Sequence, residues 1–198
     1  MKTSFFDVDT QIDFMFAAGA LAVPGAARIV NSLSALTRFA STNGIKILST
    51  ADAHSEDDPE FRSWKPHCIA GTVGQQKASA TLLSKPVVLS TKPGALDAIA
   101  GQLTQAGQII VEKQHIDCFT NENLRPLLKL LAAERFVVYG VVSEVCVRCA
   151  LLGLIETGAR IELVTDAVQS MNTAMEQETF AQFQAQGGIL TTVAAVTG

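Results

Sequence analysis

Cys146 is the side chain of this 198-residue chain whose position best suits a nucleophile. It follows the apolar run 136–142, at a point where the sequence predicts that a strand turns into a helix. The positive end of a helix stabilises an anion, so this position favours the thiolate. A buried, inert thiol is the common alternative for a free cysteine. That interpretation is kept for Cys68, Cys118 and Cys149.

A cysteine nucleophile usually needs a base, and a carboxylate is the best candidate here. Asp9 comes directly after the first strand-like run, 5–8, and partial desolvation near a thiol would raise its pKa toward neutral. Lys113 closes another apolar strand, where its charge would lower the pKa of the thiol and hold Asp9 ionised. His115 is the alternative base, although the sequence favours a solvated loop position for it.

A second group of side chains has the composition of a metal site. Asp52, His54 and His67 offer one oxygen and two nitrogen ligands for a divalent cation. Three protein ligands leave positions open for water or substrate. Cys68 is adjacent to His67 but is not assigned as a ligand, and Asp13 is expected to have a structural, hydrogen-bonding role.

The elements that must position these side chains alternate between strand-like and helix-like patterns. Strand-like runs are 5–8, 45–49, 108–111, 136–142, 161–164 and 189–193. Helix-like runs are 26–42, 123–133, 144–156 and 173–186. This alternation predicts an α/β fold with a mainly parallel sheet covered on both faces, in one domain over residues 1–198.

The candidate residues follow four different strands. Asp9, Asp52, Lys113 and Cys146 each stand at or just past a carboxyl end. Ligands of open α/β sheets bind beyond these ends, so we expect the four side chains to meet at one edge of the sheet. The proline-rich stretch Ser55–Gly107 is predicted to be a long excursion with one helix near residues 96–103.

Composition excludes several classes of function. The net charge is −4 and no Lys/Arg cluster is present, which argues against a nucleic-acid partner. No apolar run is long enough to cross a bilayer, and the N-terminus lacks the pattern of a signal peptide, so a cytoplasmic protein is expected. The CxxC spacing of Cys146 and Cys149 lacks the context of a thioredoxin-like redox pair.

In combination, these segments resemble the isochorismatase-like cysteine hydrolase superfamily, most closely its nicotinamidase-like branch. The resemblance covers almost the whole chain. It rests on the segments 9–14, 19–25, 52–54, 64–68, 71–74, 140–148 and 165–167, together with Lys113.

The resemblance implies a Rossmann-like three-layer α/β/α sandwich around a six-stranded parallel sheet. It places a catalytic triad on Asp9, Lys113 and Cys146, and an oxyanion hole on the backbone N–H groups of Val142 and Cys146. A cis peptide bond is implied at Val141–Val142. The family's metal ligands correspond to Asp52, His54 and His67, and its aromatic pocket walls to Phe14 and Trp64.

Two departures bear on the substrate. Ala53 stands where nicotinamidases commonly have an aromatic residue, and the segment after Lys113 lacks their longer Tyr-Ser motif. The resemblance therefore implies hydrolysis of a small amide, with nicotinamide as the leading substrate. Alternatives are an N-carbamoyl or ureidoacrylate amidohydrolase, then an isochorismatase or a non-catalytic binding protein. Zinc is the leading metal, with iron or manganese as alternatives, and a homo-oligomer is implied.

Overall fold

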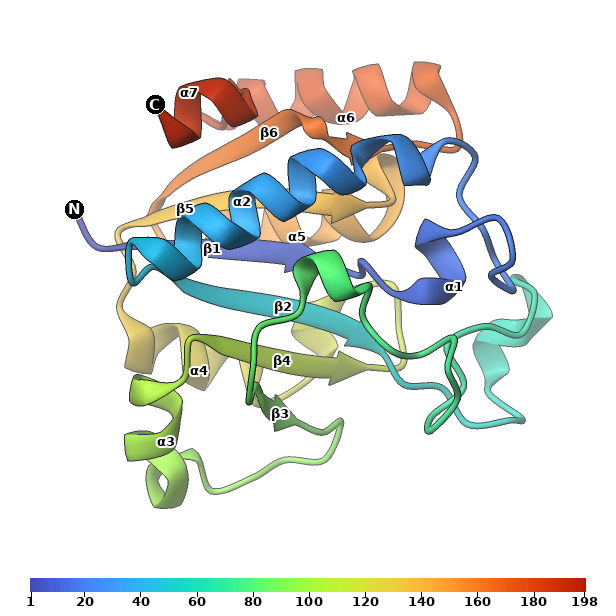
Figure 1. Ribbon diagram of the computed structural model, residues 1–198, viewed down its shortest axis with the longest axis horizontal. Coiled ribbons are helices and arrows are strands. Elements are labelled where there is room, and N and C mark those ends of the chain that lie inside the picture. The colour runs from blue at the N-terminus through green and yellow to red at the C-terminus, as the bar shows by residue number, and fades with distance from the viewer.

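The computed structural model describes residues 1–198, and its strands form one parallel sheet (Figure 1). The strands are β1 (Thr3–Val8), β2 (Lys46–Asp52), β3 (Val87–Leu89), β4 (Gln108–Lys113), β5 (Arg135–Val141), β6 (Arg160–Gln169) and β7 (Ile189–Thr191). Their order across the sheet is β3-β4-β2-β1-β5-β6-β7, and every neighbouring pair is parallel.

The sheet has seven strands, so the expected count of six was wrong. The additional strand is β3, which pairs with β4 at one edge of the sheet. It has three residues, directly after Pro86, and Val88 within it is exposed. Such a short edge strand, inside the proline-rich excursion, lacks the run of alternating or continuous apolar residues that a sequence pattern needs.

Helices cover both faces of the sheet and make three layers (Figure 1). They are α1 (Ile12–Met15), α2 (Val30–Thr42), α3 (Ala100–Gln105), α4 (Leu124–Leu131), α5 (Arg148–Ile155), α6 (Thr173–Ala185) and α7 (Val193–Thr197). One buried core joins the sheet to α3, α4, α5 and α6, and a second core joins its other face to α2 and α7. The α/β/α sandwich is therefore confirmed. None of the helices is long and apolar enough to cross a membrane.

Hydrophobic burial explains why these helices lie on the sheet. Leu124, Leu127, Leu128 and Leu131 repeat at helical spacing on α4 and are all buried. Strand β5 is buried on both faces from its second residue to its last, as a central strand of a parallel sheet requires.

Two expected helices do not begin with α-helical turns: one starts with a tighter 3-10 turn and the other with a wider π turn. The pattern over residues 26–42 starts as a 3-10 turn at Ala26–Ile29, before α2. The pattern over 144–156 starts as a π turn at Ser143–Val147, so α5 itself begins at Arg148. Further 3-10 turns lie at Pro59–Arg62, Ser79–Thr81, Leu96–Ile99 and Cys118–Thr120.

The strand order reverses direction beside β1. From β1 the chain forms β2 beside it, then the edge strand β3, and then β4 between β2 and β3, before it crosses to place β5 on the other side of β1. Parallel sheets bind ligands beyond the carboxyl ends at such a switch point. In Figure 1 these ends point to the right, toward α1 and the loops of the long excursion.

Candidate active site and metal centre

Asp9 lies immediately beyond β1, at the switch point. Its backbone has φ +48°, in the left-handed region that few residues other than glycine adopt, and its side chain is buried. The hydroxyl of Thr50, from β2, donates a hydrogen bond of 2.6 Å to Asp9 Oδ1. Burial raises the pKa of the Asp9 carboxyl, and this outweighs the opposing charge of Lys113. The raised pKa suits a carboxylate that must accept a proton.

Lys113, the last residue of β4, connects the other groups. Its buried ammonium lies 2.9 Å from Asp9 Oδ2 and 3.7 Å from Cys146 Sγ, and it also donates a hydrogen bond to Asp52 Oδ1. Burial alone would lower the pKa of Lys113, but the carboxylates of Asp52 and Asp9 outweigh it and raise the pKa well above its ordinary value. Lys113 is therefore a fixed positive charge between two carboxylates and a thiol.

Cys146 lies in the π turn that follows β5, where the carbonyl of Val142 accepts hydrogen bonds from the amides of Val145 and Val147. The Val141–Val142 peptide bond is cis, as expected. Burial raises the pKa of the Cys146 thiol well above its ordinary value, and Lys113 does not reverse this because Asp9 and Asp52 add to the effect. The expected preference for thiolate is thus not met: the thiol holds its proton and needs a base.

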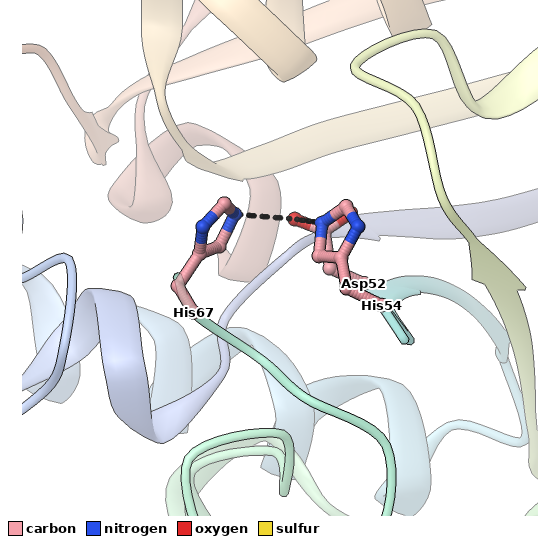
Figure 2. Close-up of side chains that lie close together, drawn as sticks. All are labelled: Asp52, His54 and His67. Carbon is pink, nitrogen blue, oxygen red and sulfur yellow. Dashed lines mark ion pairs between the residues drawn. The ribbon is translucent and has the colours of Figure 1, made fainter. Parts of the chain in front are cut away.

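Asp52, His54 and His67 come together as the sequence predicts (Figure 2). Their ligand atoms all lie within 4.8 Å of one another, and all three residues are buried. Asp52 Oδ2 lies 3.8 Å from His54 Nε2 and 3.6 Å from His67 Nε2. Burial alone would raise the pKa of Asp52, but Lys113 holds it well below the ordinary range, so the carboxylate is ionised.

The hydrogen bonds of the two imidazoles fit a metal site. His54 Nδ1 lies 2.9 Å from a carboxylate oxygen of Asp58, and His67 Nδ1 lies 2.7 Å from the carbonyl oxygen of Lys65. A proton on each Nδ1 leaves each Nε2 with a free lone pair, the arrangement typical of metal-ligating histidines. His54 Nε2 is buried and has no hydrogen-bond partner. A divalent cation is the group that would satisfy it.

Sequence patterns missed two acidic residues at this centre. Asp58 fixes His54 through the hydrogen bond to Nδ1, and Glu60 Oε1 lies 3.9 Å from His54 Nε2. Burial raises the pKa of Glu60, and the neighbouring Asp52 adds to this. Asp58 directly precedes the 3-10 turn Pro59–Arg62 and Glu60 lies within it, so only the spacing of Asp58 from His54 offered a signal.

A single pocket contains Cys146 and one edge of the metal centre. Its other lining is mostly apolar and comes from five separate segments: Phe14, Leu21, Trp64, Ile116, Val141, Val142, Val145 and Met171. The predicted aromatic walls, Phe14 and Trp64, are both among them. Asp52, Glu60 and His67 complete the lining, so Lys and Arg are absent from it.

The remaining candidates lie outside this pocket. His115 is exposed and lines a separate polar hollow, so it does not face Cys146 there. Asp13 is structural, because its carboxylate accepts hydrogen bonds from the amides of Ala20 and Cys68. Burial raises the pKa of Cys68, which keeps that thiol protonated and supports leaving it out of the ligand set.

Comparison with known proteins agrees with this architecture. The Isochorismatase domain model matches residues 4–195. The nicotinamidase of Escherichia coli (strain K12) is 21% identical, with 94% of this chain and 93% of that protein covered. Two solved structures, a pyrazinamidase of Pyrococcus horikoshii in complex with zinc and an N-carbamoylsarcosine amidase of Thermoplasma acidophilum, share the fold.

The TM-scores to these two structures are 0.80 and 0.77, each at 23% identity. The alignments cover 97% of this chain and 99% of the first structure, and 100% of both chains for the second. At this identity the structural likeness establishes the fold alone, whereas the domain model spans nearly the whole sequence. The chain therefore belongs to the isochorismatase family.

Proposed function

We propose that this protein is a cysteine-dependent amidohydrolase that cleaves a small carboxamide. The observation that carries the proposal is the contact of Lys113 with Asp9 and with Cys146 at the wall of one apolar pocket. A protonated thiol, a desolvated carboxylate and a fixed cation together provide a nucleophile, a base and a charge that balances them. We assign these three residues as the catalytic triad, within a single domain of residues 1–198.

The first half of the reaction forms a thioester. Asp9 takes the proton of Cys146 Sγ, and the thiolate attacks the carboxamide carbon. The backbone N–H groups of Val142 and Cys146 hold the oxyanion, at roughly 3 kcal/mol per donor. Asp9 then gives its proton to the amide nitrogen, the C–N bond breaks, and ammonia leaves.

The second half regenerates the enzyme. Asp9 accepts a proton from a water molecule, and the resulting hydroxide adds to the thioester carbon. Collapse of this intermediate breaks the C–S bond and releases the carboxylic acid, while Cys146 recovers its proton from Asp9. Lys113 stays protonated throughout, since its pKa is raised well above the ordinary value.

The metal centre has a binding role in this proposal. Asp52, His54 and His67 would hold a divalent cation, and their oxygen and nitrogen donors suit zinc as well as iron or manganese. When bound, such a cation supplies a Lewis-acid position for a lone pair of the substrate, such as a ring nitrogen. We propose zinc as the resident ion.

Charge at the pocket favours an uncharged substrate. Its ionisable acidic groups are Asp52 and Glu60, and no Lys or Arg lines it. A substrate with its own carboxylate, such as an N-carbamoyl amino acid, would meet these acids and would find no Lys or Arg side chain on the lining to pair with it. Phe14 and Trp64 offer aromatic walls to a flat ring. These features support nicotinamide as the leading substrate.

Ammonia release from a panel of amides tests the proposal, with metal content measured on the same samples. We expect wild type to hydrolyse nicotinamide, and Cys146→Ala to lose at least about 10³-fold in kcat while keeping its fold and metal. Cys149→Ala is the matched control, since it removes a thiol one helical turn away and should retain activity.

Full amidase activity in Cys146→Ala would refute the assignment of the nucleophile. Turnover of N-carbamoyl substrates in place of nicotinamide would keep the cysteine chemistry and replace the proposed substrate. Wild type that is inert toward every amide, with an unreactive Cys146, would indicate a non-catalytic binding protein.

A further inference from the structure

Glu144 is a buried acid two residues before Cys146, and it is not one of the triad or the metal-centre residues. Its carboxylate oxygen Oε1 accepts hydrogen bonds from the backbone amides of Met171 (2.9 Å) and Asn172 (2.8 Å). These two residues form the corner between β6 and α6. The side chain of Glu144 therefore connects the π turn that carries Cys146 directly to the corner at Met171 and Asn172.

The corner depends on this carboxylate. Neither Met171 N–H nor Asn172 N–H has another hydrogen-bond acceptor in the structure. Hydrogen bonds from amides to a carboxylate are charge-assisted and stronger than neutral ones. Asn172 caps α6, because its Oδ1 accepts from the amides of Ala174 and Met175. The position of the corner thus determines where α6 begins.

Met171 brings this corner into the proposed substrate site. Its side chain lines the pocket that contains Cys146, yet it is 37% exposed. It therefore stands at the mouth of the pocket rather than at the reacting atoms. A methionine at a pocket mouth gives a flexible apolar wall for a ring.

We propose that Glu144 is a positioning residue for substrate binding: its carboxylate holds the Met171–Asn172 corner so that Met171 forms the mouth of the pocket. Its effect on turnover rests on the proposed amidase function, whereas the anchoring of the corner does not. Ser143 makes a separate connection to α6, through a hydrogen bond of 2.8 Å to Glu176, and this bond does not involve Met171.

Steady-state kinetics with nicotinamide test the binding role. We expect Glu144→Ala to raise KM about tenfold with a smaller change in kcat, because both charge-assisted hydrogen bonds to the corner are lost. Glu144→Gln should restore KM to within about threefold of wild type, because its amide oxygen can accept the same two N–H groups. Glu178→Gln, an exposed acid on α6, is the matched control and should leave KM unchanged.

Met171→Ala tests whether Glu144 acts on substrate binding through Met171. It should raise KM like Glu144→Ala, and the double variant should be no worse than either single one, because both act on one wall. Hydrogen exchange provides a readout independent of substrate. The amides of Met171 and Asn172 should exchange about tenfold faster in Glu144→Ala, and at the wild-type rate in Glu144→Gln.

The outcomes separate the two proposals. Unchanged exchange at the corner, or a fall in kcat at constant KM, would overturn the role of Glu144, and so would equal damage from Glu144→Ala and Glu144→Gln. Wild type that hydrolyses no amide would refute the proposed function instead, and exchange would still decide whether Glu144 anchors the corner. If Glu144→Ala fails to fold, Met171→Ala and Glu144→Gln carry the test, since Met171 is partly exposed.

Discussion

Individual side chains in this site depend on partners from other strands. Asp9 and Lys113 are each too costly to bury alone, and the 2.9 Å ion pair between them makes both burials tolerable. Thr50 adds a hydrogen bond to the same carboxylate from the neighbouring strand. This hydrogen bond stabilises the ionised form of Asp9, which is the form that accepts the thiol proton in the proposed mechanism.

The pH dependence of kcat/KM should show the effect of the Thr50 hydrogen bond on the pKa of Asp9. In the proposed mechanism ionised Asp9 is the base, so activity should rise with pH through the pKa of Asp9, which burial places above the ordinary range of an aspartate. In Thr50→Val the pKa rises further, more Asp9 is protonated at a given pH, and the acidic limb moves to higher pH. On that limb we expect kcat/KM to fall about fivefold, the value of a hydrogen bond of about 1 kcal/mol.

Thr50→Ser keeps the hydroxyl and is the matched control. Metal content must be measured at each pH, because protonation of His54 would compete with metal binding there. An acidic limb at the same pH in Thr50→Val and wild type would show that the hydrogen bond does not tune the base.

The sequence predicted the reactive residues that stand at strand ends. It did not predict the residues whose roles depend on partners far away in the sequence. Asp9, Lys113 and Cys146 stand at strand ends, so topology alone brings them together. Glu60 and Glu144 carry no such signal, because their roles depend on a loop path and on a corner 27 residues away. The pKa direction of Cys146 was also missed, since burial depends on packing that the sequence does not display.

Among the elements, β5 and its neighbour β1 determine the geometry of the π turn Ser143–Val147, which carries Cys146. Gly140 has φ +123°, and a Cβ atom there would lie 2.1 Å from the carbonyl oxygen of Val8. β1 and β5 are adjacent strands, so Asp9, just beyond β1, lies next to the turn after β5 that carries Cys146. The strong apolar run of β5 was predictable from sequence, whereas the three-residue edge strand β3 was not.

Gly140→Ala should destabilise the protein by about 3 kcal/mol or more, because the new side chain meets rigid backbone and the conformation is strained. Urea unfolding would show the loss as a lower midpoint, and amide turnover should fall with it. Gly158→Ala is the control: its φ is +77° but its Cβ would meet nothing within 4 Å, so the cost should be about 1 kcal/mol. Equal midpoints for the two variants would contradict the close-approach argument.

At the scale of the whole molecule, helices cover both faces of the sheet, and the site lies at the remaining edge, beyond the carboxyl ends of the strands. Residues from β1, β2, β4 and the turn after β5 meet there, on either side of the switch point. The layers and the meeting of these strand ends followed from the alternating pattern of the sequence. The paths of the excursion loops, which carry Glu60, Trp64 and His67 to the pocket, did not, since they lack a regular period.

Removal of the metal should lower stability as well as binding. A ligand at 100 times its Kd stabilises the folded state by about 2.7 kcal/mol, so chelation should lower Tm by roughly 5–10 °C and zinc should restore it. KM for the amide should rise in the same samples. Cys146→Ala should show the full Tm shift, and His54→Ala should show almost none. A Tm that does not change on chelation would exclude a tightly held ion at Asp52, His54 and His67.

The two oxygens of Asp52 contact different partners, and this double role limits how the site can change during evolution. One oxygen bonds the ammonium of Lys113, and the other faces the two imidazoles. A substitution of Asp52 would remove a ligand of the proposed metal and, at the same time, a counterion of Lys113, which lies beside Cys146. Under the proposed roles, the metal ligands and the catalytic residues cannot change independently, because a variant that loses Asp52 also loses part of the charge balance around Lys113.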